Sequence, residues 1–126
     1  MYRVGVLKDF IAQHYLTGGD WGAENHPHSH SYRLEVELRG RELGPHQYLA
    51  DIVAIEQTLE RLIASYRDHT LNELPEFAGV NPSLERFARV LCESMAKDFL
   101  TGAVEVISVK LWENSFAWAG YEIARG

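Results

Sequence analysis

Residues 31–39 read Ser-Tyr-Arg-Leu-Glu-Val-Glu-Leu-Arg, in which apolar and charged side chains alternate without interruption. Successive side chains of a β-strand point to opposite faces, so this alternation predicts a strand that is buried on one face and solvated on the other. The buried face would carry Tyr32, Leu34, Val36 and Leu38, and the solvated face Arg33, Glu35, Glu37 and Arg39.

A partner strand is expected upstream of this alternation. From Tyr2 to Phe10 the apolar residues Val4, Val6 and Phe10 share one parity, which predicts a first strand. The segment from Gly18 to Pro27 is rich in glycine and polar residues, and it is expected to be the loop between the two strands.

Two helices are predicted after the second strand. Asp51 is a suitable cap for a helix that runs to about Tyr66, because apolar residues recur there at a spacing near 3.6. The pair Asn81-Pro82 predicts the start of a second helix, since proline is favoured at the first helical position. Gly102 is expected to end that helix.

The C-terminal part is expected to form a β-hairpin. Its strands would run from Val104 to Glu113 and from Phe116 to Ala124, joined by a turn around Asn114-Ser115. The order strand, strand, helix, helix, strand, strand predicts an α+β fold in which both helices cover one face of an antiparallel sheet. The other face would mix charged and apolar side chains, which would suit an oligomer interface.

Length and charge restrict the class of protein. The chain has 126 residues and a formal net charge of -6. The length fits one domain, and the charge argues against a nucleic-acid partner, which requires clustered Lys and Arg. No apolar run approaches the length of a membrane span, and the N-terminus lacks a signal-peptide core. The single cysteine, Cys92, cannot form an internal disulfide, so a cytoplasmic location is expected.

Three histidines form a candidate metal site. His28 and His30 share parity with Tyr32, and His14 lies at the end of the first strand, where antiparallel pairing could bring it beside them. Three imidazole ligands leave a fourth position open for water or substrate, which is typical of catalytic zinc. The alternative is a histidine-rich surface loop without a metal. His26 and His46 are weaker candidates, because each adjoins a proline.

Six segments, in chain order, resemble sequence motifs of one enzyme family. They are Phe10-Ile-Ala-Gln-His14, His28-Ser-His30-Ser-Tyr32, Leu49-Ala-Asp51-Ile, Asp68-His69-Thr-Leu71-Asn72, Asn81-Pro82-Ser83-Leu-Glu85 and Leu111-Trp-Glu113-Asn. On these segments the chain resembles the 6-pyruvoyl-tetrahydropterin synthase and 6-carboxy-tetrahydropterin synthase family. The resemblance covers nearly the whole chain, as a single domain over residues 1–126.

The resemblance implies a fold, an assembly and a cofactor. The family has the tunnelling fold, or T-fold, in which a four-stranded antiparallel sheet carries two helices on one face. Its subunits join edge to edge into trimeric barrels, and two barrels stack into a hexamer. Zinc would be held by His14, His28 and His30, and the substrate would be a small pterin. No nucleic-acid or membrane partner is implied.

The resemblance also suggests roles for four other residues. Glu113 would bind the pterin through its carboxylate, although a strand-end residue turned to solvent is the alternative. Ser83 would help to hold the pterin, unless it is only a helix-start serine. Asp68 and His69 would form a proton-transfer pair, with a polar helix end as the alternative reading.

Glu24 is the main departure from the family pattern. It stands four residues before His28, where the family's enzymes carry a catalytic cysteine, and Cys92 cannot replace that cysteine by any sequence argument. A related branch carries glutamate at this spacing and cleaves the side chain of 7,8-dihydroneopterin triphosphate, giving 6-hydroxymethyl-7,8-dihydropterin. The sequence therefore favours that lyase reaction, with Glu24 in catalysis.

Two other functions are compatible with the same sequence. The first is a 6-carboxy- or 6-pyruvoyl-tetrahydropterin synthase that works without the cysteine. The second is a non-catalytic homologue that binds pterin or metal. The pathway would be folate or queuosine biosynthesis.

Overall fold

The computed structural model describes residues 1–126 as an antiparallel sheet with two α-helices. The strands are β1 (Tyr2–His14), β2 (His28–Gly40), β3 (Val106–Trp112) and β4 (Trp118–Ala124), and the helices are α1 (Ile52–Ala64) and α2 (Leu84–Phe99). Three short 3-10 helices cover Gly22–Asn25, Leu71–Glu73 and Pro75–Phe77. The element order and the α+β class are those predicted from the sequence.

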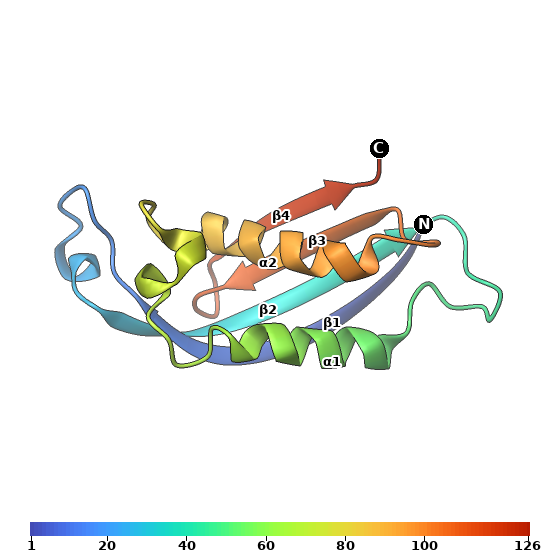
Figure 1. Cartoon of the computed structure of the whole chain (residues 1–126), viewed down its shortest axis with the longest axis horizontal. Helices are drawn as coiled ribbons and strands as arrows, with labels where there is room; N and C mark the ends of the chain where they lie inside the picture. Colours follow the sequence, from blue (N-terminus) through green and yellow to red (C-terminus); the bar gives the residue numbers. More distant parts are fainter.

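The strands lie in the order β1-β2-β3-β4, and every neighbouring pair is antiparallel. β1 and β2 have 13 residues each, whereas β3 and β4 have only 7. The long pair therefore extends beyond the β3–β4 hairpin and carries the loop of residues 15–27 at its far end (Figure 1). This extension leaves a step where the sheet narrows from four strands to two.

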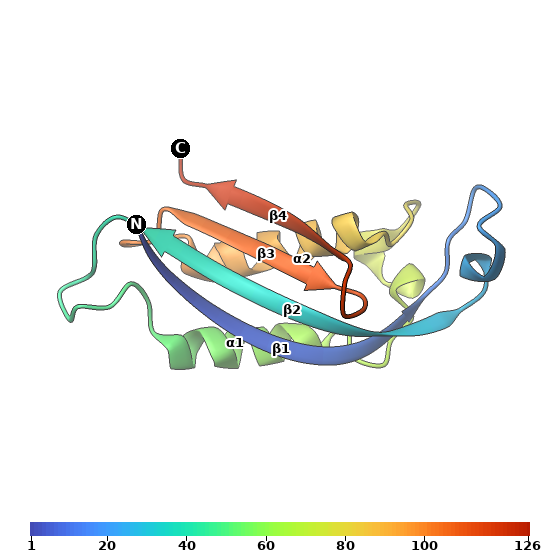
Figure 2. The same cartoon turned by 180° about the vertical axis from the view of Figure 1, so that it is seen from behind.

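Both helices pack on the same face of the sheet, as expected, and the other face is uncovered (Figure 2). The core lies between helices and sheet and includes 23 buried apolar residues. The alternation in β2 is confirmed, because Tyr32, Leu34, Val36 and Leu38 are at most 1% exposed. An amphipathic strand and two amphipathic helices thus bury their apolar sides against one another.

Several predicted boundaries were wrong. β1 continues past Phe10 to His14, because β2 pairs with it over the whole length from Tyr2↔Gly40 to His14↔His28. The hairpin strands are shorter than predicted. At the turn, the residues on both sides of Asn114 are lost from the strands, because its side chain accepts hydrogen bonds from two backbone N–H groups, and β3 also begins at Val106 instead of Val104. The predicted loop contains the 3-10 helix Gly22–Asn25.

The helix caps were predicted in one case and missed in the other. Asp51 caps α1, as predicted, by accepting a hydrogen bond from the Val53 N–H. α2 begins at Leu84, and its cap is Ser83 and not Asn81, because the Ser83 side chain accepts from the Arg86 N–H. α1 ends at Ala64, two residues before Tyr66, and α2 ends at Phe99.

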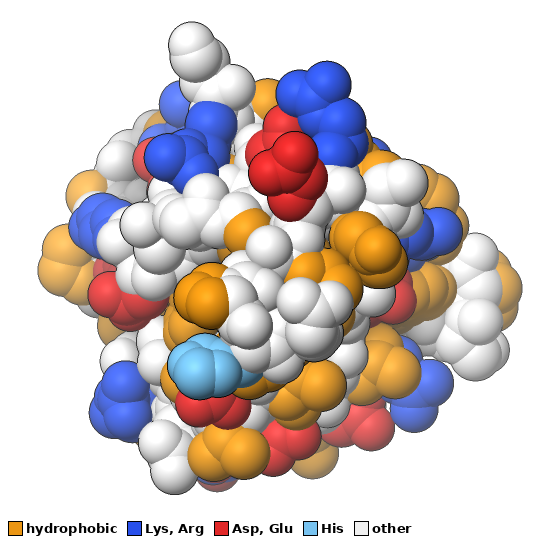
Figure 3. All heavy atoms as spheres, turned by 90° about the vertical axis from the view of Figure 1, so that its right-hand side faces the viewer, with side chains coloured by type: hydrophobic (Ala, Val, Ile, Leu, Met, Phe, Trp, Pro, Cys, Tyr) orange, Lys and Arg blue, Asp and Glu red, His pale blue; other side chains and the backbone are white.

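The surface at the end opposite the long-strand loop carries Lys and Arg side chains interspersed with Asp and Glu (Figure 3). None of the helices has the length and apolar character required to cross a membrane.

Candidate metal centre

The extended part of β1 and β2 places three histidines side by side. His14 pairs directly with His28, and His30 pairs with Ala12 two positions further along the same face. The ring centroids of His14, His28 and His30 lie 4.6, 4.9 and 4.9 Å apart. The strand register alone therefore brings together three side chains that are separated in the sequence.

Each histidine of this cluster has a buried Nε2 atom without a hydrogen-bond partner. The opposite ring nitrogen of two of them is occupied. His14 Nδ1 lies 3.0 Å from the Pro82 carbonyl oxygen, and His28 Nδ1 lies 2.8 Å from the His26 carbonyl oxygen. Carbonyl oxygens only accept, so both Nδ1 atoms carry the proton and both Nε2 lone pairs are free. Such outer hydrogen bonds are typical of metal-binding histidines.

Burial keeps His14 in its neutral form. The side chain is 4% exposed, and this burial lowers the pKa of His14 below its ordinary value of 6.5, while the Pro82 hydrogen bond acts in the opposite direction. A metal ligand must be unprotonated. The environment of His14 therefore favours the form that can bind a cation.

Glu24 completes the cluster. It lies in the 3-10 helix Gly22–Asn25, and its Oε2 is 2.7 Å from His28 Nε2, without the alignment of a hydrogen bond. One oxygen of Glu24 and one nitrogen of each of His14, His28 and His30 all lie within 4.8 Å of one another. Three imidazoles and one carboxylate suit zinc, and the orphaned nitrogens indicate that a cation fits here.

Glu113 lies at the step where the sheet narrows. It directly follows β3, and its Oε2 is 3.8 Å from His30 Nε2. The carboxylate also helps burial to raise the pKa of Tyr32, which lies beneath the histidines with its ring 5.7 Å from that of His30. A hollow of about 600 Å³ is lined by Glu113, Asn114, Ser115 and residues of β1 and β2. Glu113 borders this hollow and also approaches His30, but none of the three histidines lines the hollow, whose β1 and β2 residues lie on the uncovered face of the sheet.

Ser83 is connected to the cluster through the chain. It follows Pro82, whose carbonyl holds His14, and its Oγ accepts the Arg86 N–H at the start of α2. This capping bond leaves the hydroxyl hydrogen free to donate.

Asp68 and His69 lie apart from the cluster. Both are exposed, and no hydrogen bond joins them. The Asp68 backbone, at φ 62°, donates to the Ile11 carbonyl, and the His69 carbonyl accepts from the Gln13 N–H, so the pair borders the outer edge of β1. His69 Nδ1 is 2.9 Å from the Arg67 carbonyl. The predicted pairing of Asp68 with His69 is therefore absent within one subunit.

Cys92 is remote from this chemistry. It is fully buried in α2, where burial raises the pKa of its thiol to about 11. Its Sγ contacts the Ile107 carbonyl oxygen at 3.8 Å. These surroundings suit a small core residue and not a nucleophile.

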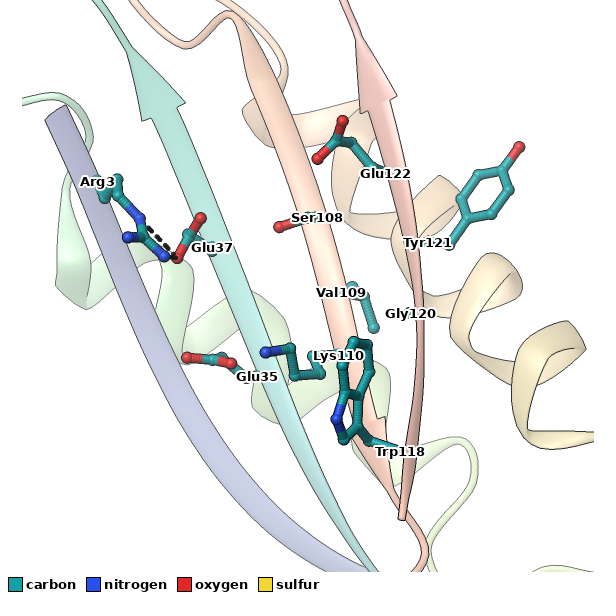
Figure 4. Close-up of a pocket in the computed structure, with 10 residues that line it drawn as sticks. All are labelled: Arg3, Glu35, Glu37, Ser108, Val109, Lys110, Trp118, Gly120, Tyr121 and Glu122. Atoms are coloured by element: carbon teal, nitrogen blue, oxygen red, sulfur yellow. Dashed lines mark hydrogen bonds and ion pairs between the residues drawn. The ribbon is translucent and has the colours of Figure 1, made fainter. Parts of the chain in front are cut away.

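A further hollow of about 350 Å³ lies on the uncovered face of the sheet (Figure 4). It contains the Arg3–Glu37 ion pair, and Lys110 lies over the Trp118 ring at 4.4 Å. None of the clustered histidines lines it. Among its charged residues, Arg3 pairs with Glu37 and Glu122 pairs with Arg39, and the hollow contains no histidine.

Sequence reasoning missed the contacts that hold the cluster in place. The Pro82 carbonyl and the aromatic rings below the histidines were not anticipated, although Pro82 belongs to a recognised motif. The Tyr32 ring stacks on Phe10 and meets Phe87 edge-on. The apolar parity of these residues predicted their burial, but not their contact with the histidines.

The sheet order, the two helices on one face and the histidines on the longest strands define a T-fold protein with a group of side chains that could hold a metal ion. The model of the family described as 6-pyruvoyl tetrahydropterin synthase matches residues 3–124. The chain belongs to the 6-pyruvoyl tetrahydropterin synthase family.

Solved structures agree with this assignment. The 6-pyruvoyl tetrahydropterin synthase of Caenorhabditis elegans is similar with a TM-score of 0.83 and 18% identity, over 98% of this chain and 96% of that one. The Plasmodium falciparum protein has a TM-score of 0.82 and 12% identity, with 98% of both chains covered. At such identities the matches show the fold. No curated protein sequence matches the chain.

A third similar structure is a variant of a catalytic residue. It is the Plasmodium vivax 6-pyruvoyltetrahydropterin synthase in which a glutamate described as a catalytic residue is replaced by alanine. The TM-score is 0.79 and the identity 13%, over 99% of this chain and 100% of that one.

Proposed function

We propose that this protein is a zinc-dependent pterin enzyme that cleaves the side chain of 7,8-dihydroneopterin triphosphate to 6-hydroxymethyl-7,8-dihydropterin. The observation that carries the proposal is the position of Glu24. Its carboxylate lies 2.7 Å from His28 Nε2, which has no hydrogen-bond partner. A family member from Plasmodium vivax also uses a catalytic glutamate, according to its description.

His14, His28 and His30 would hold the zinc ion, which when bound supplies Lewis acidity at the side-chain hydroxyls of the substrate. Glu24 would take the proton from the hydroxyl on the second side-chain carbon. The bond between the first and second carbons then breaks, its electron pair moves toward the pterin ring, and a proton returned to the first carbon completes the hydroxymethyl group. The second carbon leaves as an aldehyde that carries the triphosphate.

Orientation of the ring would fall to Glu113 and Ser83. A carboxylate can accept two parallel hydrogen bonds from the amino group and ring N–H of a pterin. Glu113 is 32% exposed and borders a hollow of about 600 Å³, so it is accessible for this contact. The free hydroxyl hydrogen of Ser83 would supply a further bond.

Asp68 and His69 are proposed to act in proton transfer across a subunit boundary. They border the outer edge of β1, so an edge-to-edge assembly would bring them against a neighbouring subunit. We propose a hexamer of two stacked trimeric barrels on this basis, built from the single domain over residues 1–126 in the cytoplasm.

A second candidate is favoured by the family match itself. The chain could form a 6-carboxy- or 6-pyruvoyl-tetrahydropterin, with Glu24 in place of the usual cysteine. A non-catalytic pterin-binding or metal-binding role is the third.

Product analysis separates the three candidates. Purified zinc-loaded protein is incubated with 7,8-dihydroneopterin triphosphate, and the products are identified by mass spectrometry. The lyase yields 6-hydroxymethyl-7,8-dihydropterin. A pyruvoyl or carboxy product would replace the proposal with the second candidate, and bound but unchanged substrate would replace it with the third.

A further inference from the structure

Residues 15–17 continue the chain beyond the end of β1 without a strand beside them. A short extended segment normally leaves backbone N–H and C=O groups unpaired unless another group supplies partners. At Tyr15 and Thr17 these partners are asparagine side chains, which come from segments far away in the sequence.

The side chains of Asn72 and Asn81 each form hydrogen bonds with the backbone N–H and C=O groups of one residue of this segment. The Tyr15 N–H donates to Asn72 Oδ1 at 3.0 Å, and Asn72 Nδ2 donates to the Tyr15 carbonyl at 2.8 Å. The Thr17 N–H donates to Asn81 Oδ1 at 2.9 Å, and Asn81 Nδ2 donates to the Thr17 carbonyl at 3.0 Å. Each amide therefore occupies the place that a peptide group of a neighbouring strand would fill.

The opposite edge of the segment is bound to the Glu24 helix. The Leu16 N–H donates to the Glu24 carbonyl at 2.7 Å, and Asn25 Nδ2 donates to the Leu16 carbonyl at 3.0 Å. Leu16 thus connects directly to the backbone of Glu24. An amide group on one edge and the glutamate backbone on the other fix the lateral position of the segment.

Asn81 belongs to a motif that also contacts the metal cluster. The next residue is Pro82, whose carbonyl holds His14 Nδ1 at 3.0 Å. The segment that starts α2 therefore fixes His14 through a carbonyl and the path toward Glu24 through an amide. This use of Asn81 explains why its side chain does not cap α2.

We propose that Asn72 and Asn81 are positioning residues that hold residues 15–17 so that His14 meets His28 and His30 in the arrangement needed for metal binding, with Glu24 placed beside them. The inference rests on the zinc site of the proposed function, but not on the reaction. Groups that orient metal ligands typically affect metal affinity by about 10–100-fold.

The test uses Asn72→Ala, Asn81→Ala and the double variant, with Asn81→Asp as a near-isosteric change that replaces the donor NH2 group by a negatively charged acceptor oxygen. Asp51→Ala is the matched control, because it also deletes a side chain that binds a backbone N–H, at the end of α1 that lies far from residues 15–27 (Figure 1). The zinc dissociation constant is measured by competition with a chromophoric chelator. The visible spectrum is recorded at saturating Co²⁺.

We expect each single alanine variant to weaken zinc binding about tenfold, and the double variant to weaken it further, toward about 100-fold. The cobalt spectrum should change in the same variants, and Asp51→Ala should leave both readouts unchanged. A purely structural contribution would lower thermal stability and leave the spectrum at saturation unaltered. If the double variant does not fold, Asn81→Asp carries the test alone.

A folded double variant with wild-type zinc affinity and an unchanged cobalt spectrum would overturn the inference, as would the same result for Asn81→Asp when the double variant is unfolded. Wild-type protein that binds zinc without converting the pterin would refute the proposed reaction only. Wild-type protein that binds neither metal would overturn both.

Discussion

Glu24 differs from the other members of the cluster because it is exposed and carries a charge. Its side chain is 49% exposed, whereas those of His28 and His30 are 24% and 20% exposed and that of His14 is nearly buried. A carboxylate at the rim of three imidazoles can reach an incoming hydroxyl without losing its contact with solvent. This position suits a group that moves a proton.

Replacing Glu24 by alanine should reduce kcat by about 10²–10⁴-fold, because the proton acceptor is lost. Zinc content and pterin affinity should stay near wild type, since the three histidines and Glu113 are intact. Steady-state kinetics with metal analysis checks this prediction. Glu56→Ala, on the exposed side of α1, is the control and should have wild-type turnover. Unchanged turnover of Glu24→Ala would contradict its proposed role.

His14 makes the stability of the zinc-free protein depend on pH. Burial lowers its pKa in the folded protein below 6.5, so the unfolded chain takes up the proton first as the pH falls. The contribution of His14 is therefore fully present above pH 6.5 and is lost as the pH falls from 6.5 toward the lower pKa of the folded protein. Urea denaturation at a series of pH values measures the free energy of unfolding.

His14→Gln should flatten that pH dependence, and the exposed His46→Gln should leave it as in the wild type. An equal slope for wild type and His14→Gln would show that His14 is not the group responsible.

At the scale of elements, one aromatic ring of α2 connects the hydrophobic core to the three histidines. Phe87 is fully buried, and its ring meets those of Phe10, Tyr32, Tyr66 and Phe77 at centroid distances of 5.1–5.9 Å. Tyr32 in turn lies below His14 and His30. The packing of α2 on the sheet thus continues directly into the floor of the site.

Phe87→Ala should destabilise the protein by about 3–5 kcal/mol, because it leaves a cavity among closely packed rings. Phe116 lies in the hairpin turn and is 82% exposed. Phe116→Ala should therefore change the free energy of unfolding by less than about 0.5 kcal/mol. Chemical denaturation of both variants gives the comparison. Similar losses for the two would contradict the assignment of Phe87 to the core.

The elements could be predicted from the sequence because their signals are local. The alternation in residues 31–39 and the Asp51 cap depend only on neighbouring side chains. The end of β1 and the start of α2 depend on distant partners. Pairing with β2 extends β1 to His14, and Thr17 uses the Asn81 amide that the sequence suggested as a cap. No local pattern reveals either contact.

The residues of the candidate site also differ in whether the sequence alone could place them. The histidine spacing and the strand parity were sufficient to suggest that His14, His28 and His30 meet. The positions of Asp68 and His69 could not be derived from a local pattern, and in the proposed assembly their place relative to a substrate depends on a second subunit. The sequence motif identifies these two residues, but it does not show which surface of another subunit would face them.

At the scale of the whole molecule, the two edges of the sheet are unequal. The outer edge of β1 is occupied near its C-terminal end by the backbone of residues 68–70, through Ile11 and Gln13. The N-terminal part of β1 and the whole outer edge of β4 have no strand beside them. Exposed strand edges tend to pair with one another, so these two are suited to join neighbouring subunits.

In the proposed assembly of two stacked trimeric barrels, the purified protein has a mass of six chains in sedimentation equilibrium. A trimer would indicate that barrels form without stacking. A monomer at micromolar concentration would contradict the edge-to-edge assembly, and with it the proposed contact of Asp68 and His69 with a neighbouring subunit.

In the proposed site, three histidines from two strands hold a catalytic zinc ion. Zinc K-edge X-ray absorption of the purified, zinc-loaded protein tests it most directly. We predict one zinc per chain with three imidazole nitrogens at about 2.0–2.1 Å and the remaining scattering from oxygen. A sulfur neighbour at about 2.3 Å, which only Cys92 or a methionine could supply, or a zinc ion without imidazole ligands would contradict the account.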